Sequence, residues 1–255
     1  MQENRINMLW EWAVREAQNF VEIAARRLPV SIPPCGEEAA RTIANYGKRR
    51  KNKIRIVLEE NRALASIETD DSDLWVFGYG SLIWKPGFDY IESALAWVHG
   101  YHRSLCIFSH VHRGTPERPG LVLGLDHGGS CQGVAFRVAG RDRAATIAYL
   151  RERELVTSVY LEKIVSLRLA DGGTVRALAY VVDRDHHQYA GRLPLDHMTR
   201  LVAEGVGVNG DNPAYVRNTY EHLLRLDIHD AELAAVVRGV DDASCRAALL
   251  RPADE

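Results

Sequence analysis

Two glycines flank a tyrosine in the segment Phe77-Gly78-Tyr79-Gly80-Ser81-Leu82, directly after a short apolar run. Glycine lets the backbone approach a ligand closely, and successive N–H groups of such a loop can point into one concavity. A loop of this kind suits a carboxylate or a developing oxyanion; a plain tight turn is the alternative. The spacing matches neither a P-loop nor a dinucleotide-binding fingerprint, and Ser81 lies outside the G-x-S-x-G pattern of hydrolases.

Glu154 is the second residue whose surroundings indicate chemistry. It ends the charged run Arg151-Glu152-Arg153-Glu154 and precedes residues 155–160, which are uncharged and rich in β-branched side chains. Apolar surroundings raise the pKa of a carboxyl group, and a general base needs a raised pKa near neutral pH. The alternating charges alone favour the alternative, an ion-paired glutamate at a helix end.

The metal-ligating and thiol residues do not form a recognisable site. The four cysteines are scattered without a C-x-x-C pair, at positions Cys35, Cys106, Cys131 and Cys245. The nearest histidine pairs, His110-x-His112 and His186-His187, have no cysteine or carboxylate at ligand spacing beside them. The sequence therefore predicts no metal site and no disulfide framework, and it places these histidines on the surface or in loops.

The elements that must position these residues are short strands and helices that do not alternate regularly. Strands are predicted at 74–77, 105–109, 121–125, 133–138, 164–169 and 176–182, with a hairpin turn at Asp171-Gly172-Gly173-Thr174. Helices are predicted at 141–153, 195–204, 213–226 and 231–250, the third with Asn212 as N-cap and Pro213 in its first position. This order favours a mixed α+β domain over a doubly wound sheet.

The first 72 residues have a helical pattern that differs from the short strands and helices of the remainder. Apolar residues recur at helical spacing over 8–28, the proline-containing run Leu28–Pro34 ends that helix, and a second helix is predicted over 36–64. Glu68–Asp73 is polar and acidic, as linkers are. We therefore expect a helical extension with its linker at 1–72 and a catalytic domain at 73–255.

Composition limits the partners of the chain. Its 255 residues carry a formal net charge of −2, which argues against nucleic-acid binding by the molecule as a whole. The basic run Lys48–Arg55 could contact nucleic acid, but a solvated helix face is the plainer interpretation. No apolar run is long enough for a membrane span and the N-terminus lacks the pattern of a signal peptide, so we expect a cytoplasmic protein without membrane partners. Composition assigns no oligomeric state.

Five ordered motifs over about residues 73–230 resemble the ChaC family, the glutathione-specific γ-glutamylcyclotransferases. They are the segment from Leu74 to Pro86, His112-Arg113-Gly114-Thr115-Pro116 with Pro119-Gly120, Gly133-Val134-Ala135-Phe136-Arg137, Tyr149-Leu150-x-x-Arg153-Glu154 with Tyr160, and Gly210-x-Asn212-x-x-Tyr215. The resemblance implies a compact β-barrel with flanking helices, no metal or organic cofactor, and cleavage of glutathione into 5-oxoproline and Cys-Gly.

The resemblance also assigns roles to residues of this chain. It implies that Glu154 is the general acid/base and that Tyr79-Gly80-Ser81-Leu82 holds the γ-glutamyl group. Tyr160, Arg113 and Tyr215 are further candidates for substrate contact.

The chain departs from the family pattern at Leu121, where an arginine often stands, and at Leu155. We expect the first departure to remove a charge that anchors substrate. Two alternatives therefore remain open: a cyclotransferase for other γ-glutamyl compounds, and a non-catalytic binding protein on the same fold.

Overall fold

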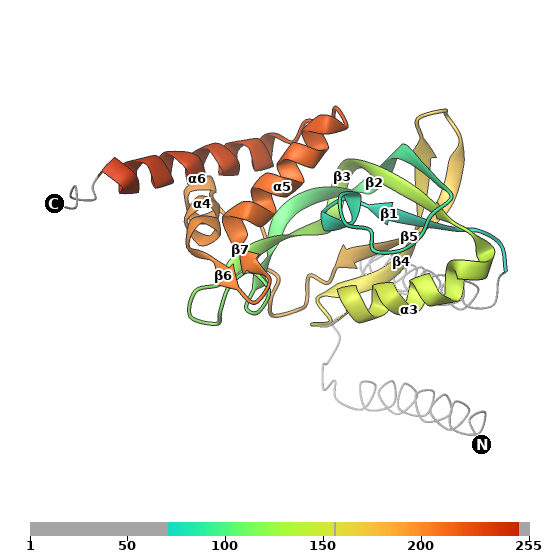
Figure 1. Cartoon of the computed structure of the whole chain (residues 1–255), viewed down its shortest axis with the longest axis horizontal. Coiled ribbons are helices and arrows are strands. Elements are labelled where there is room, and N and C mark those ends of the chain that lie inside the picture. Colours follow the sequence, from blue (N-terminus) through green and yellow to red (C-terminus); the bar gives the residue numbers. More distant parts are fainter. Residues whose placement is uncertain (1–70, 156, 250–255) are drawn as a thin grey trace, which may run out of the picture. The chain divides into compact units, whose positions relative to one another are not determined.

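A closed five-stranded barrel forms the centre of the computed structural model, which describes residues 71–155 and 157–249 (Figure 1). The strands are β1 (Leu74–Gly78), β2 (Glu92–Ser109), β3 (Gly120–Val138), β4 (Tyr160–Leu169) and β5 (Thr174–Val182). Their order around the barrel is β1-β3-β2-β4-β5, and β1 closes it by pairing in parallel with β5. The prediction of an α+β barrel with flanking helices is confirmed.

β2 and β3 are much longer than predicted, because they pair with each other over nearly their whole length. The predicted strands 121–125 and 133–138 are two halves of β3, which has 19 residues. Between them Gly128 and Gly129, at φ of 103° and 70°, lie where the pairing register shifts opposite Gly100 of β2. The glycine-rich segment between the two predicted strands therefore forms a bulge inside one strand.

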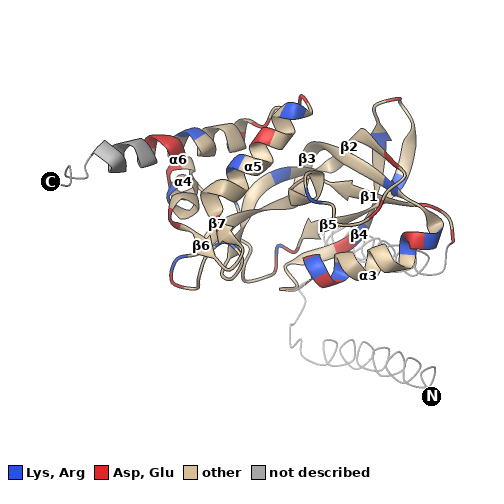
Figure 2. Cartoon of the chain, in the orientation of Figure 1, with Lys and Arg blue, Asp and Glu red and all other residues tan. Residues whose placement is uncertain are grey.

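Helices cover the barrel at two places (Figure 1). They are α3 (Arg143–Glu154), α4 (Leu195–Glu204), α5 (Asn212–Arg225) and α6 (Ala231–Leu249), with short 3₁₀ turns η1 (Ser81–Ile83) and η2 (Gly140–Asp142). Helices α4, α5 and α6 pack together beside β3, together with the small hairpin β6 (Val206–Gly207) and β7 (Gly210–Asp211). Basic and acidic residues alternate over Arg151–Glu154, at the C-terminal end of α3 (Figure 2).

The core fills the barrel with side chains from every strand. Its largest fully buried members include Phe77, Leu105, Leu121 and Leu167. In β5 the run Ala177–Val182 is buried on both faces, because one face packs in this core and the other, with Leu178 and Tyr180, packs in a second cluster with residues of α3. Among the described residues, no helix has the length and apolar character needed to cross a membrane.

The N-cap prediction for α5 was wrong by one residue. The Asp211 side chain accepts a hydrogen bond from the N–H of Ala214 at 2.6 Å and caps the helix. Asn212 is instead fully buried, and its side chain bonds both the N–H and the carbonyl of Leu121. The Asn-Pro pair thus fixes α5 against β3, which the capping pattern alone could not indicate.

The predicted helices at 8–28 and 36–64 lie outside the described residues, as do the basic run Lys48–Arg55 and the first half of the acidic linker. The last residues of the linker are fixed to the barrel. The Ser72 carbonyl accepts a hydrogen bond from Arg143 at 2.8 Å, and Asp73 binds Arg137 and the N–H of Gly140. Ser72 and Asp73 are therefore part of the structure built around the barrel.

A chain that begins at Thr69 is expected to fold and to keep most of its activity, because it retains the Ser72 and Asp73 contacts. A chain that begins at Leu74 loses them and is the matched comparison, with a lower melting temperature expected. Thermal melts and turnover of the two shortened chains and the full-length protein test this. An insoluble or inactive Thr69 chain, beside an active full-length protein, would show that residues 1–68 complete the core.

Candidate active site

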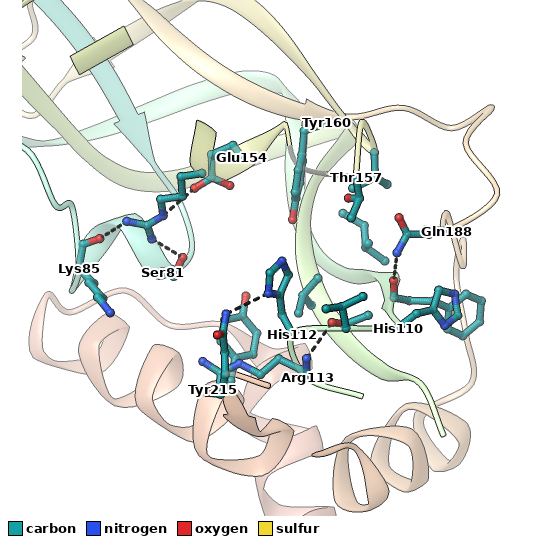
Figure 3. Close-up of a pocket in the computed structure, with 18 of the residues that line it drawn as sticks. Ser81, Lys85, His110, His112, Arg113, Glu154, Thr157, Tyr160, Gln188 and Tyr215 are labelled. Carbon is teal, nitrogen blue, oxygen red and sulfur yellow. Dashed lines mark hydrogen bonds and ion pairs between the residues drawn. The ribbon is translucent and has the colours of Figure 1, made fainter. Parts of the chain in front are cut away.

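Two connected hollows lie at one end of the barrel, between its strands and the helices. The larger, here called the outer cavity, has a volume of about 490 Å³, and the smaller, here called the inner pocket, about 30 Å³. Both are lined by Ser81, Glu154, Tyr160 and Tyr215 (Figure 3). A ligand with one small end and one larger end therefore fits this shape, with Glu154 at the junction.

Seven of the eight residues predicted from sequence line the inner pocket. They are Tyr79, Gly80, Ser81, Leu82, Glu154, Tyr160 and Tyr215. The eighth, Arg113, lines the outer cavity. Leu123 and Tyr180 complete the inner pocket and were not singled out by the sequence.

The glycine-containing loop reaches the pocket because β1 ends at Gly78 and the chain turns at once into η1. A Cβ on Gly78 would lie 3.0 Å from Phe136 and 3.2 Å from the Cβ of Leu82, so a larger residue there would have to displace its core neighbours. At Gly80 a Cβ would meet only Leu123, at 3.6 Å, and the Tyr215 hydroxyl, at 4.0 Å. Gly80 therefore faces the inner pocket, whereas Gly78 faces the core.

Backbone donors are available at the start of η1, since the first N–H groups of a helical turn have no partner within that turn. These are the N–H groups of Ser81 and Leu82. The loop is held in place around them: Arg103 donates to the Tyr79 carbonyl at 2.6 Å, and the Tyr79 hydroxyl donates to the Tyr180 carbonyl at 2.9 Å. Leu82 is buried in the core. Tyr79 and Leu82 therefore position the loop.

Glu154 is the last residue of α3, and its side chain is only 16% exposed. Burial raises the pKa of this carboxyl group above its ordinary value, while the Arg153 guanidinium, 3.1 Å from its Oε1, opposes the shift. The carboxylate can therefore accept a proton more readily than a solvated glutamate and still ionise. The structure thus combines the two possibilities from the sequence: Glu154 is buried, and it also forms an ion pair with Arg153.

Arg153 connects Glu154 to the glycine-containing loop, a role that the sequence did not predict. Besides its ion pair with Glu154, its guanidinium donates to Ser81 Oγ at 2.9 Å and to the Lys85 carbonyl at 2.6 Å (Figure 3). It also donates to the Tyr149 hydroxyl, four residues earlier on α3, at 3.1 Å. The i, i+4 spacing of Tyr149 and Arg153 was the available signal.

Arg153→Met is expected to move the acidic limb of the pH profile of kcat/KM to higher pH. The substitution removes the cation that lowers the pKa of Glu154, so the carboxylate is protonated at a higher pH. Arg153→Lys keeps the charge but not the forked contacts, so we expect its pH profile to stay near that of wild type while kcat falls. An unchanged profile in Arg153→Met would contradict this role.

Tyr160 and Tyr215 hold the backbone of Leu123 from two sides. The Tyr160 hydroxyl donates to the Leu123 carbonyl at 2.8 Å, and the Tyr215 hydroxyl accepts from the Leu123 N–H at 3.3 Å. Burial raises the pKa of both phenols, that of Tyr215 to about 12, so both stay protonated at neutral pH. Tyr215 consequently keeps its own proton available for a ligand beside Gly80.

Leu121 does not face either cavity, which corrects an expectation from the sequence. The side chain is fully buried in the barrel core, and the backbone is paired with Asn212. Leucine at this position, where the family often has an arginine, therefore removes no charge from the outer cavity or the inner pocket of this chain. The charges that line the outer cavity come instead from Lys85, Arg113, Arg153 and Glu154.

Comparison of the sequence with known proteins identifies a family and several relatives. The family model described as "ChaC-like protein" matches residues 74–243. A protein of Escherichia coli (strain K12) named "Glutathione-specific gamma-glutamylcyclotransferase" is 33% identical over 168 residues, covering 66% of this chain and 73% of that protein. The Homo sapiens protein "Glutathione-specific gamma-glutamylcyclotransferase 1" is 34% identical over 177 residues, covering 67% of this chain and 80% of that protein.

A solved structure has the same fold. It is described as a selenomethionine-labelled γ-glutamyl cyclotransferase specific to glutathione from yeast, and it superposes with a TM-score of 0.62. The match covers 67% of this chain and 96% of that chain at 23% sequence identity.

Proposed function

The chain belongs to the ChaC-like protein family, and from this premise we propose that it is a γ-glutamylcyclotransferase that cleaves glutathione to 5-oxoproline and Cys-Gly. The single observation that carries the proposal to this chain is Glu154, a buried carboxylate with a raised pKa at the junction of a small and a large hollow. The γ-glutamyl group would lie beside Glu154 with one end entering the inner pocket, and the outer cavity would hold the rest of the substrate.

The proposed reaction needs one group that first removes a proton and later returns one. Glu154 takes a proton from the substrate α-ammonium, and the freed amine attacks the γ-carbonyl carbon to close a five-membered ring. The C–N bond to cysteine then breaks as Glu154 gives its proton to the departing amine, and the second proton of the attacking nitrogen follows through Glu154, so that Cys-Gly leaves in its ammonium form. The attack is intramolecular, so holding the chain folded supplies much of the rate.

Fixed donors are needed for the negative charge that develops on the γ-carbonyl oxygen. The N–H groups of Ser81 and Leu82 and the Tyr215 hydroxyl are the candidates, since all three residues line the inner pocket. No covalent intermediate is part of this mechanism. Ser81 Oγ accepts a hydrogen bond from Arg153, a partner that cannot serve as a general base.

The test is direct: the purified protein is incubated with glutathione, and 5-oxoproline and Cys-Gly are measured. Equal amounts of the two products are expected. Turnover of other γ-glutamyl compounds but not glutathione would favour the alternative substrate class. Binding of glutathione without any 5-oxoproline would favour the non-catalytic alternative.

Chelators and thiol substitutions are expected to leave turnover unchanged. Among the described residues, no group of three or more histidine, cysteine, aspartate or glutamate side chains is placed to hold a metal ion. Burial raises the pKa of Cys106 to about 12 and also raises that of Cys131, so both thiols stay protonated and unreactive.

5-Oxoproline release with and without EDTA, and in Cys106→Ala and Cys131→Ala, measures this. Inhibition by EDTA that added zinc reverses would overturn the prediction. The proposal places the protein in the cytoplasm, a reducing compartment compatible with these two free thiols.

A further inference from the structure

We propose that Arg103 is a positioning residue of the active site, which turns the N–H of Gly80 towards the inner pocket as a further donor to the γ-carbonyl oxygen of the substrate. The inference rests on the proposed function and deepens it by connecting the glycine-containing loop to the start of α6. Its starting point is a buried ion pair that the mechanism does not use, between Arg103 and Asp230, whose side chains are only 5% and 13% exposed.

The contacts of Arg103 are the first observation. Its Nε donates to the Tyr79 carbonyl at 2.6 Å, its Nη2 to the Gln132 carbonyl at 2.6 Å, and its Nη1 to Asp230 at 3.1 Å. Each nitrogen of the guanidinium thus has an acceptor of its own. Because the planar fork is engaged on every side, it holds the Tyr79 carbonyl in one direction.

The peptide group between Tyr79 and Gly80 converts this contact into a direction for an N–H. The peptide bond is planar and trans, so its carbonyl and its N–H point to opposite sides. Because Arg103 holds the Tyr79 carbonyl on one side, the N–H of Gly80 points to the other. Among the described residues no acceptor bonds this N–H, and Gly80 lines the inner pocket.

A third backbone donor fits the two already proposed at the inner pocket. Gly80, Ser81 and Leu82 are successive residues, and all three line this pocket. Successive N–H groups in a turn form a concavity that suits an anionic oxygen. The γ-carbonyl oxygen becomes such an anion as the ring closes, so the Gly80 N–H should act mainly in the transition state.

Asp230 fixes Arg103 from the start of α6. Its Oδ1 accepts from the N–H of Leu233 at 3.0 Å, and its Oδ2 accepts from Arg103. Two residues further on, Glu232 accepts from the N–H of Leu105 at 3.0 Å. Both carboxylates therefore tie α6 to β2, but only Asp230 is connected to the glycine-containing loop, through Arg103.

Arg103→Lys is expected to lower kcat for glutathione by about tenfold or more, with a smaller change in KM. Lysine keeps a cation beside Asp230 but cannot replace the forked donors, so the peptide group before Gly80 loses its fixed direction. Asp230→Asn should shift kcat in the same direction, because the amide has one acceptor oxygen in place of the two that serve Leu233 and Arg103. Rates of 5-oxoproline release, taken well below the melting temperature of each variant, measure this.

Glu232→Gln is the matched control, since it is an acid-to-amide change two residues from Asp230 at the same end of α6. Its contact is with the N–H of Leu105 and not with the loop, so kcat should stay near wild type even if the melting temperature falls. Equal losses of kcat in Asp230→Asn and Glu232→Gln, or an unchanged kcat in Arg103→Lys, would show a purely structural ion pair and overturn the inference. A loss confined to KM would overturn the transition-state role.

The amide signal of Gly80 in an NMR spectrum provides a test that needs no turnover. In the Glu154→Gln protein labelled with ¹⁵N-glycine, the Gly80 signal is the one that disappears when Gly80→Ala is added. Saturating glutathione should move this amide proton downfield, as expected for a new hydrogen bond to oxygen. Adding Arg103→Lys should reduce the shift, whereas adding Glu232→Gln should not.

The inference and the proposed function fail in different ways. If the wild type releases no 5-oxoproline from glutathione, the proposed function is wrong. If it does, but saturating glutathione leaves the Gly80 amide signal in place, the N–H of Gly80 is not a donor to substrate. If the signal moves equally in the Arg103→Lys and Glu232→Gln proteins, Arg103 does not position it.

Discussion

Glu154→Gln is expected to lower 5-oxoproline release from glutathione by about 10²–10⁴-fold. The amide keeps the size and shape of the side chain but cannot take the proton from the substrate ammonium. Glu152→Gln, two residues earlier on the exposed face of α3, is the control and should have little effect. Near wild-type turnover in Glu154→Gln would refute the general acid/base assignment.

The same variant should keep or raise the melting temperature at neutral pH. Burial raises the pKa of Glu154 in the folded state, so the folded protein binds this proton more tightly than the unfolded chain does. The free energy of unfolding therefore falls as the pH rises from the ordinary glutamate pKa through the raised one. Glutamine removes that penalty, and a thermal melt separates loss of chemistry from loss of fold.

Gly80→Val is expected to abolish activity while the fold is retained. A Cβ at this position would make ordinary contacts with Leu123 and the Tyr215 hydroxyl, but the two further methyl groups of valine would enter a pocket of only about 30 Å³. Gly80 has a φ of −132°, outside the left-handed region, so the expected loss comes from the added side chain and not from a positive φ.

Two milder variants separate the explanations for Gly80. Gly80→Ala adds only the Cβ and should retain measurable turnover, and Ser81→Ala should retain more, because the backbone N–H survives the change. If Ser81 were instead a nucleophile, Ser81→Ala would be inactive and a covalent γ-glutamyl adduct would form on Ser81 in the wild type. Mass spectrometry of the protein during turnover distinguishes the two outcomes.

The fold class and most elements could be predicted because they depend on local pattern. Leu74–Phe77 and Arg176–Val182 are apolar runs bounded by turn residues, and Asp171-Gly172 marks a hairpin whose Gly172 has a φ of 90°. Most of β2, residues 92–104, was missed, because these residues alternate weakly and owe their extended conformation to pairing with β3. A short window of sequence does not show which distant segment a strand will pair with.

The same limit applies to the site. The positions of Glu154 and of the Tyr79–Leu82 loop followed from a family resemblance, but the bonds that join them did not. Arg153 and Ser81 are 72 residues apart in sequence, and Tyr160 and Leu123 are 37 apart. Only the closed barrel brings such partners together. The resemblance therefore identified the residues that face the ligand, but not the residues that hold them in position.

Closure of the barrel has a consequence for how the protein is made. β1 pairs with β5, and the Tyr79 hydroxyl bonds a carbonyl 101 residues further along the chain. Contacts between segments so distant form slowly, after the loops between them have been ordered. The loop that begins at Tyr79 leaves the ribosome early but can acquire its final geometry only once β5 has been synthesised. An unfinished chain would then be unable to consume glutathione.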